Sequence, residues 1–159
     1  MLSHSFLART GVLTALLGAA AATVVLACPP SLTVERPAGA SAGGDDAFVV
    51  VRSFHGCHPG SLAVTGTAEG LVGGARRSMA LQLAPTDTAG VYRVRRQWPR
   101  EGVWVLRLTV TEGDGHATAL VGVGPSGDVA VIRQPARRGE VREVSDADVA
   151  ALLHRLAES

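Results

Sequence analysis

Short apolar runs broken by turn residues place the strongest constraint on how this chain can fold. Between Ala47 and Arg133, such runs end at Gly, Pro or Asp about every eight to twelve residues. That spacing is too short for alternating strands and helices, and it is typical of antiparallel sandwiches and barrels. We therefore expect residues 47–133 to form one β-sandwich domain.

The clearest runs alternate with the period of a half-buried strand. In residues 103–110, Arg107 and Thr109 share one face, and the other face is wholly apolar, with Trp104, Leu106, Leu108 and Val110. Residues 91–98 and 78–83 alternate in the same way. A period of two with one apolar face predicts strands that cover a shared core. Further strands are expected at residues 47–54, 61–67, 117–123 and 128–133.

The expected fold class is all-β. About seven or eight strands in roughly 100 residues is the size of an immunoglobulin-like antiparallel β-sandwich. The Cys–Trp–Cys pattern of antibody domains is absent from the sequence. Gly113-Asp114-Gly115 and Pro125-Ser126-Gly127 have the composition of tight hairpin turns.

One short helix is expected at residues 145–158, after a polar connector at residues 134–144. Ser145 is a suitable N-cap because Asp148 follows three residues later. Four apolar side chains then recur at the spacing of one helical face: Val149, Leu152, Leu153 and Leu156. A helix of about twelve residues is marginal alone. Its apolar face therefore either docks on the domain's own sheet or receives a partner protein.

Residues 1–27 have the pattern of an export signal. A short polar start with His4 and Arg9 precedes an apolar stretch, and Ala27 supplies a small residue just before Cys28. The alternative is an uncleaved anchor, because the stretch is about as long as the shortest membrane span of roughly 18 residues. Residues 28–46 are expected to hold an edge strand followed by an Ala/Gly/Ser-rich linker.

The composition argues against nucleic-acid binding and indicates where the protein works. All 15 basic residues are Arg, there is no Lys or Asn, and the net charge is +1. A near-neutral chain lacks the basic footprint of a nucleic-acid-binding protein. The residue bias is that of a GC-rich bacterial genome. We expect an exported protein of the periplasm or cell envelope that touches the membrane only through its N-terminal segment or an attached lipid.

Three chemical states of Cys28 are compatible with the sequence. The segment Val25-Leu26-Ala27-Cys28 resembles a bacterial lipobox, in which Cys28 is lipidated. In an oxidising compartment Cys28 pairs instead with Cys57, and the bridge closes a loop of about 30 residues that contributes roughly 3–4 kcal/mol. In the third case both thiols stay free.

The densest group of reactive side chains is the loop Phe54-His55-Gly56-Cys57-His58-Pro59-Gly60. Thiolate and imidazole ligands suit copper or zinc, so His55, Cys57 and His58 form a candidate metal site, with His116 from another hairpin as a further ligand. In an extended loop, His55 and Cys57 face one way and His58 the other. The site needs a free Cys57 thiolate and therefore competes with the disulfide.

The sequence offers little support for enzyme chemistry. A Cys57 nucleophile needs a base held by a third group, and no Asp, Glu or Asn lies near it. The carboxylates form no paired acid/base arrangement that the sequence supports. Arg93 and Arg95 alternate onto the outward face of one strand, which we interpret as a solvated face. We expect no catalytic residue and no cofactor.

One segment resembles a known group of proteins. The run Gly90-Val91-Tyr92-Arg93-Val94, followed by Trp98-Pro99-Arg100-Glu101-Gly102-Val103-Trp104-Val105-Leu106, is similar to the FixH-like and YtkA-like bacterial envelope domains. With a turn-and-insert segment at residues 67–74, the resemblance spans residues 67–106. It implies an immunoglobulin-like sandwich on the outer side of a membrane, and some relatives are linked with copper or cytochrome-oxidase assembly. No family metal-ligand motif carries over to this chain.

Two hypotheses of function follow. The first is a non-enzymatic, exported cell-envelope module that contacts a protein partner through its sheet face or its terminal helix. The second is a periplasmic copper- or zinc-binding protein that uses the loop of His55, Cys57 and His58. The chemical state of Cys57 separates them.

Overall fold

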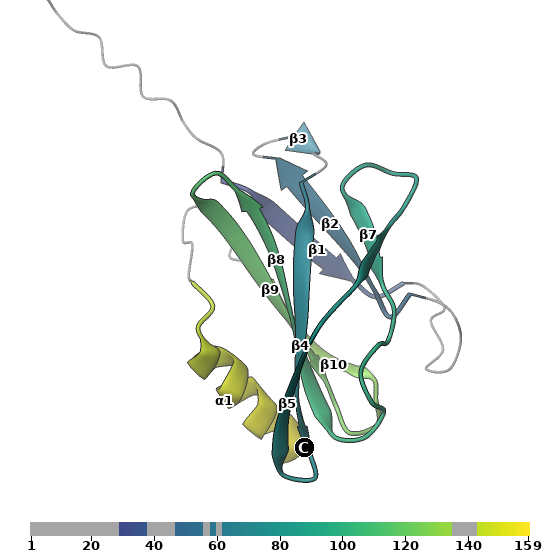
Figure 1. The fold of residues 1–159 in the computed structure, drawn as a ribbon, viewed down its shortest axis with the longest axis vertical. Helices are drawn as coiled ribbons and strands as arrows, with labels where there is room; N and C mark the ends of the chain where they lie inside the picture. The colour runs from purple at the N-terminus through teal and green to yellow at the C-terminus, as the bar shows by residue number, and fades with distance from the viewer. Residues whose placement is uncertain (1–28, 38–46, 56–57, 60–61, 135–142) are drawn as a thin grey trace, which may run out of the picture.

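The computed structural model describes residues 29–37, 47–55, 58–59, 62–134 and 143–159 (Figure 1). The expected signal at residues 1–27, Cys28 and Cys57 lie outside these residues, as do the linker 38–46 and most of the connector 134–144. The described part contains ten strands, of which β3 and β6 have only two and three residues. Strands this short leave no periodic pattern, which is why seven or eight were expected.

The elements follow one another along the chain as β1 (Ser31–Glu35), β2 (Val49–His55), β3 (His58–Pro59), β4 (Val64–Val72), β5 (Ala75–Ala80), β6 (Leu83–Pro85), β7 (Val91–Val94), β8 (Val103–Glu112), β9 (Gly115–Val123), β10 (Val129–Arg133) and α1 (Asp146–Ala157).

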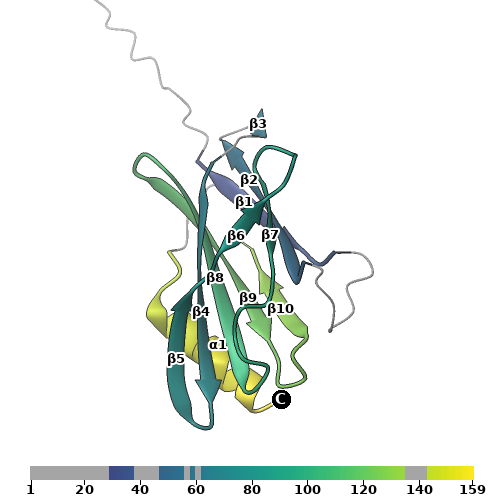
Figure 2. The same cartoon turned by 45° about the vertical axis from the view of Figure 1, so that its right-hand side comes forward.

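The strands form two antiparallel sheets that face each other (Figures 1 and 2). Sheet A has the order β1-β2-β7-β6, with β3 added to β2, and sheet B has the order β10-β9-β8-β4-β5. In sheet A this order corresponds to strands A, B, E and D of the immunoglobulin fold, and β4, β8 and β9 correspond to C, F and G. The expected immunoglobulin-like sandwich with one C-terminal helix is confirmed.

Strand β4 lies further along the chain than expected. It runs from Val64 to Val72, so the predicted strand at residues 61–67 covers only its beginning. Residues 67–72, which resemble a turn-and-insert segment, are therefore regular strand, and the turn itself falls at Gly73 and Gly74 with φ of 56° and 79°. Gly70 inside the strand has a packing reason, because a Cβ there would lie 2.4 Å from the Trp104 ring.

The single strand expected at residues 78–83 is divided between the two sheets. Strand β5 ends at Ala80 in sheet B, and β6 begins at Leu83 in sheet A. At the crossing, the Gln82 N–H donates to Gln97 Oε1 at 2.8 Å, and Gln97 Nε2 donates to the Gln82 carbonyl at 2.7 Å. A side chain thus satisfies the backbone groups that a neighbouring strand would otherwise satisfy.

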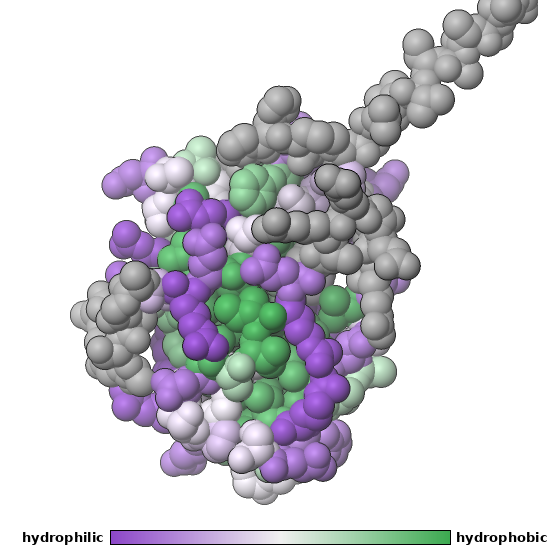
Figure 3. Space-filling model, turned by 180° about the vertical axis from the view of Figure 1, so that it is seen from behind, coloured by the Kyte–Doolittle hydropathy of each residue, from purple (hydrophilic) through white to green (hydrophobic). Residues whose placement is uncertain are grey.

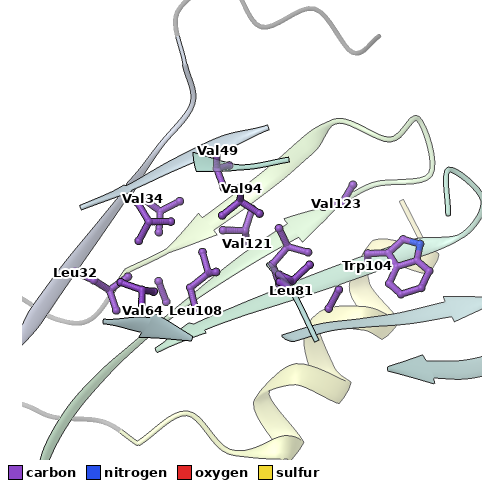
Figure 4. Packing of buried hydrophobic residues seen from close by; sticks show 14 of the residues in the cluster. Leu32, Val34, Val49, Val64, Leu81, Val94, Trp104, Leu108, Val121 and Val123 are labelled. Atoms are coloured by element: carbon purple, nitrogen blue, oxygen red, sulfur yellow. The ribbon is translucent and has the colours of Figure 1, made fainter. Parts of the chain in front are cut away.

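The main core fills the space between the sheets (Figure 4). Strand β8 contributes the apolar face expected of it: Trp104, Leu106, Leu108 and Val110 are all buried there. Its other face is buried where Val103 and Val105 lie beneath α1, whereas Arg107 and Thr109 further along are half-buried. Contacts on both sides of this central strand fix the positions of the neighbouring strands and of the helix.

Helix α1 begins and ends where the sequence predicts. The Ser145 side chain accepts a hydrogen bond from the Asp148 N–H, and the Asp148 carboxylate accepts one from the Ser145 N–H, which completes a capping box. Its apolar face is buried against sheet B beside Val103, Val105 and Leu120, and consists of Val149, Leu152, Leu153 and Leu156. The helix therefore docks on its own domain, and that face is occupied.

Candidate functional site

A contact between a histidine and a glutamate joins the two sheets at the end of the sandwich that carries the β2–β3 and β8–β9 hairpins. His55 Nδ1, at the end of β2, contacts Glu112 Oε1, at the end of β8. The His55 side chain is 59% exposed and that of Glu112 is 29% exposed. The second carboxylate oxygen of Glu112 is buried and has no hydrogen-bond partner in the described part of the chain. This end of the molecule therefore holds an imidazole beside an incompletely paired carboxylate.

Of the three predicted metal ligands, the structure places the backbones of His55 and His58 next to each other. His55 and His58 occupy directly opposite positions in the β2–β3 ladder, at the two ends of the short segment that contains Cys57. Cys57 and the side chain of His58 are outside what the structure describes. Among the described side chains, no group of three or more His, Cys, Asp or Glu residues could hold a metal ion. The three-residue ligand set remains a prediction.

His116 lies on the other side of sheet B from Glu112. It lies opposite Thr111 in the β8–β9 ladder, in a strand whose alternate residues Ala117 and Ala119 face the core. Alternation places His116 on the outer face of sheet B, whereas Glu112 follows the inward-facing positions of β8. The sheet itself separates the two side chains, so His116 does not lie beside Glu112, and its role as a further ligand with Cys57 and His58 stays a prediction.

The described residues that lie nearest to Cys28 and Cys57 in sequence are located at this same end of the sandwich. Ser31 pairs with Phe54 in the β1–β2 ladder, and each of these residues is three positions from a cysteine in sequence. Pro30 lies against the β8–β9 hairpin, because a Cβ at Gly115 would be 2.9 Å from the proline Cδ. The described flanks of Cys28 and Cys57 are thus neighbours, which is what a disulfide between them requires.

We predict that the mature protein contains a Cys28–Cys57 disulfide. Because the bridge closes a loop of about 30 residues, its reduction should lower the free energy of unfolding by roughly 3–4 kcal/mol. Peptide mapping by mass spectrometry, with and without reductant, detects the linked peptides, and denaturant unfolding measures the loss. The Cys57→Ser variant is the control, since reductant should leave its stability unchanged. An acyl chain on Cys28, or free thiols on both residues, would contradict the prediction.

A network of ion pairs on the outer face of sheet B links helix α1 to strands β4, β5 and β8. Arg76 Nη2 donates to Glu69 Oε2 at 2.5 Å, and Arg107 Nη2 donates to Asp146 Oδ1 at 2.7 Å, at the start of α1. Glu69 Oε1 lies 3.8 Å from Arg107 and connects the two pairs. The hydrogen bond from Arg107 lowers the pKa of Asp146, and the hydrogen bond to Glu69 raises the pKa of Arg76. These charges have structural partners.

Arg96 also has a structural role. Its guanidinium lies 5.4 Å from the Phe48 ring centroid and 5.6 Å from that of Trp98, and it donates to the Gly127 carbonyl. Burial, and then repulsion by Arg100, lower the pKa of Arg96. A cation stacked on two rings closes the opposite end of the sandwich. Arg76 and Arg96, each of which is next to another arginine in the sequence, are therefore not free surface charges.

Side chains also protect two edge strands. Arg36 Nη2 donates to the Val129 carbonyl at 2.5 Å, and Gln134 Nε2 donates to the Val34 carbonyl at 3.0 Å. Both contacts join β1 or its end to β10 or its end, across the open side of the sandwich. Carbonyls occupied in this way are less able to pair with a foreign strand.

The outer face of sheet A is different, because no described element covers it. Helix α1 packs on β4, β8 and β9, on the far side of the sandwich (Figures 1 and 2). Half-buried Val50, Phe54 and Val91 alternate on this face of sheet A with the exposed side chains of Arg52 and Arg93. The rear view also shows hydrophobic side chains in a central band with hydrophilic ones on both sides (Figure 3). The molecule thus presents mixed apolar and charged surface.

The sequence did not reveal Glu112 or the uncovered face. The usable signal for Glu112 was its place beside the Gly113-Asp114-Gly115 turn, which puts it at a hairpin end. The signal for the uncovered face was the single helix, since one short helix can cover the outer face of only one sheet.

Comparison with protein-family models gives no match, and neither a curated protein nor a solved structure matches the chain. In the part of the chain that the structure describes, no helix is long and apolar enough to cross a membrane.

Proposed function

We propose that the protein is a non-enzymatic, exported cell-envelope module that acts by contact with another protein. The observation that carries this proposal is the unequal covering of the two sheets. Sheet B is covered by α1, whereas the outer face of sheet A has no cover among the described residues. Arg52, Arg93 and Phe54 on this face belong to residue types that are enriched at protein interfaces. The contact surface of this proposal is therefore the outer face of sheet A.

Three features of the sequence support a location in the cell envelope and a protein as the partner. The export pattern of residues 1–27 leads to the periplasm or cell envelope, and the resemblance of residues 67–106 to FixH-like and YtkA-like domains points to the same place. The net charge of +1 argues against nucleic acid as the partner. Membrane attachment in this proposal comes only from the N-terminal segment, with a lipid on Cys28 as the alternative to the predicted disulfide.

Photo-crosslinking in living cells tests the contact. A photo-reactive residue at Val50, in the middle of sheet A, should form one discrete adduct whose second component is an exported protein, identified by mass spectrometry. The same residue at Ala151, which is exposed on α1, is the matched control and should give no such adduct. Equal adducts at both positions, or none at Val50, would refute the proposal.

A second candidate function is copper or zinc binding by His55, Cys57 and His58. It is favoured by the β2–β3 register, which sets the two histidines opposite each other, and by Glu112 beside His55. Imidazole, thiolate and carboxylate together suit zinc or copper. Mass spectrometry of Cys57 decides between the candidates, because a Cys28–Cys57 bridge removes the thiolate. Metal retained by the wild type and lost from Cys57→Ser would establish the second.

A further inference from the structure

We propose that the outer face of sheet A binds a short acidic segment of a partner protein, in which every second residue is alternately acidic and apolar. This inference rests on the proposed function and specifies the chemistry of the partner. It follows from the register of the strands, from an unbalanced charge and from the size of the face.

The register arranges apolar and cationic side chains in a regular grid. Arg52 on β2 lies opposite Thr33 on β1 and Val91 on β7. In the next outward-facing row, Val50 lies opposite Glu35 and Arg93. Along β2 and β7 the outward positions are therefore alternately apolar and cationic. An extended segment in which every second residue is alternately acidic and apolar has the same repeat, because only every second side chain of a strand points to one face.

The charges on this face do not balance. Within the described strands of sheet A, Glu35 is the one carboxylate, and its Oε2 lies 3.6 Å from Arg52 Nε. Arg93, directly opposite Val50, has no carboxylate partner in the described part of the chain. Arg95 is exposed immediately beyond the end of β7. A ligand that supplies carboxylates completes the pattern.

The outer face of sheet A is small, so a short peptide segment fits it better than the surface of a whole folded protein. Strands about 4.8 Å apart and five residues of about 3.4 Å each give β1, β2 and β7 a face of roughly 14 by 17 Å, or about 250 Å². Stable protein pairs bury about 800 Å² on each partner. A stable dimer through this face alone is therefore disfavoured, and a short extended segment fits it.

The acidic groups of the chain's own helix are a poor match for this face in a second copy. Asp146 at the start of α1 is already bonded to Arg107, and Asp148 belongs to the capping box with Ser145. Engaging them would break contacts that hold the helix. The helix of a second copy is therefore disfavoured as the occupant of this face.

Fluorescence anisotropy tests this assignment with a labelled synthetic peptide in which Glu and Val alternate at every second position, with Ser between them, so that both face the sheet. The full protein should bind it weakly, and added salt should weaken binding further because the charges are exposed. Arg93→Glu should reduce affinity about tenfold or more, since a like charge then faces the peptide. Arg155→Glu makes the same charge change on an exposed position of α1 and should leave affinity within about twofold, because it lies beyond a Debye length of about 10 Å. Arg93→Gln should give an intermediate loss.

Each contrary outcome identifies what is wrong. No binding at about 1 mM peptide, weaker than about 4 kcal/mol, overturns the proposal. Equal losses in Arg93→Glu and Arg155→Glu overturn it as well, because the attraction is then diffuse. Binding to phosphatidylglycerol vesicles that depends on Arg93, without peptide binding, assigns the face to a membrane instead. A specific crosslink at Val50 combined with failure of the peptide leaves the proposed function standing and removes only this inference.

Discussion

The Trp104→Ala substitution is expected to lower the free energy of unfolding by about 3–5 kcal/mol, because it deletes a large side chain from a close-packed core. Trp104 is 2% exposed, lies between the two sheets, and donates from Nε1 to the Glu101 carbonyl at 2.9 Å (Figure 4). Denaturant unfolding followed by circular dichroism measures the loss. A decrease below about 1 kcal/mol would mean that the indole is not a core side chain.

Gly70 provides the matched test of this packing. It lies opposite Trp104 in the β4–β8 ladder, where an added Cβ would be 2.4 Å from the ring atoms Cδ2 and Cε3. Gly70→Ala alone should therefore be destabilising, whereas in the Trp104→Ala background its cost should shrink because the obstructing ring is absent. A double-mutant cycle measures this coupling, which we expect to be about 1–3 kcal/mol. Additive effects would show that the two residues do not share a contact.

Removal of residues 145–159 is expected to abolish cooperative folding. The truncation uncovers Val103, Val105 and Leu120, which α1 buries on the outer face of sheet B. A chain that exposes this surface should bind a hydrophobic dye and aggregate. Dye fluorescence and light scattering of the truncated protein, compared with the full chain, measure both effects.

Two point variants show whether the truncation acts through the lost packing of α1 or only through the shorter chain. Leu152→Ala deletes a buried side chain of α1 and should cost about 2–5 kcal/mol. Ala151→Ser changes the adjacent exposed residue and should stay within about 0.5 kcal/mol of the wild type. A truncated protein that unfolds cooperatively with unchanged stability would mean that α1 is dispensable.

Regular periodicity made the elements of this fold predictable. The alternation in residues 103–110 identified the central strand β8, and the capping pair Ser145 and Asp148 fixed the start of α1. The errors arose where tertiary contacts override a local pattern. Gly70 weakens the strand signal of β4, yet its missing side chain is what the Trp104 ring requires. The continuous alternation at residues 78–83 conceals a change of sheet that depends on Gln97, far along the chain.

The candidate site was predictable only as a set of residue types. The loop with His55 and His58 stands out in the sequence, but its hairpin register and the contact with Glu112 join positions that no local pattern connects. The outer face of sheet A is recognisable only once it is known which sheet the helix covers. Cys28 and Cys57 lie outside the described residues, and the disulfide remains a prediction.

The position of α1 in the chain has a consequence for synthesis. Both sheets are complete by Arg133, before the helix that covers sheet B has been made. At about 5–20 residues per second, the interval before Ala157 emerges is on the order of a few seconds. Until then Val103, Val105 and Leu120 are uncovered on any chain whose sheets have formed. The helix that covers them is made after both sheets, and a chain that is released before α1 has been made keeps this apolar surface exposed.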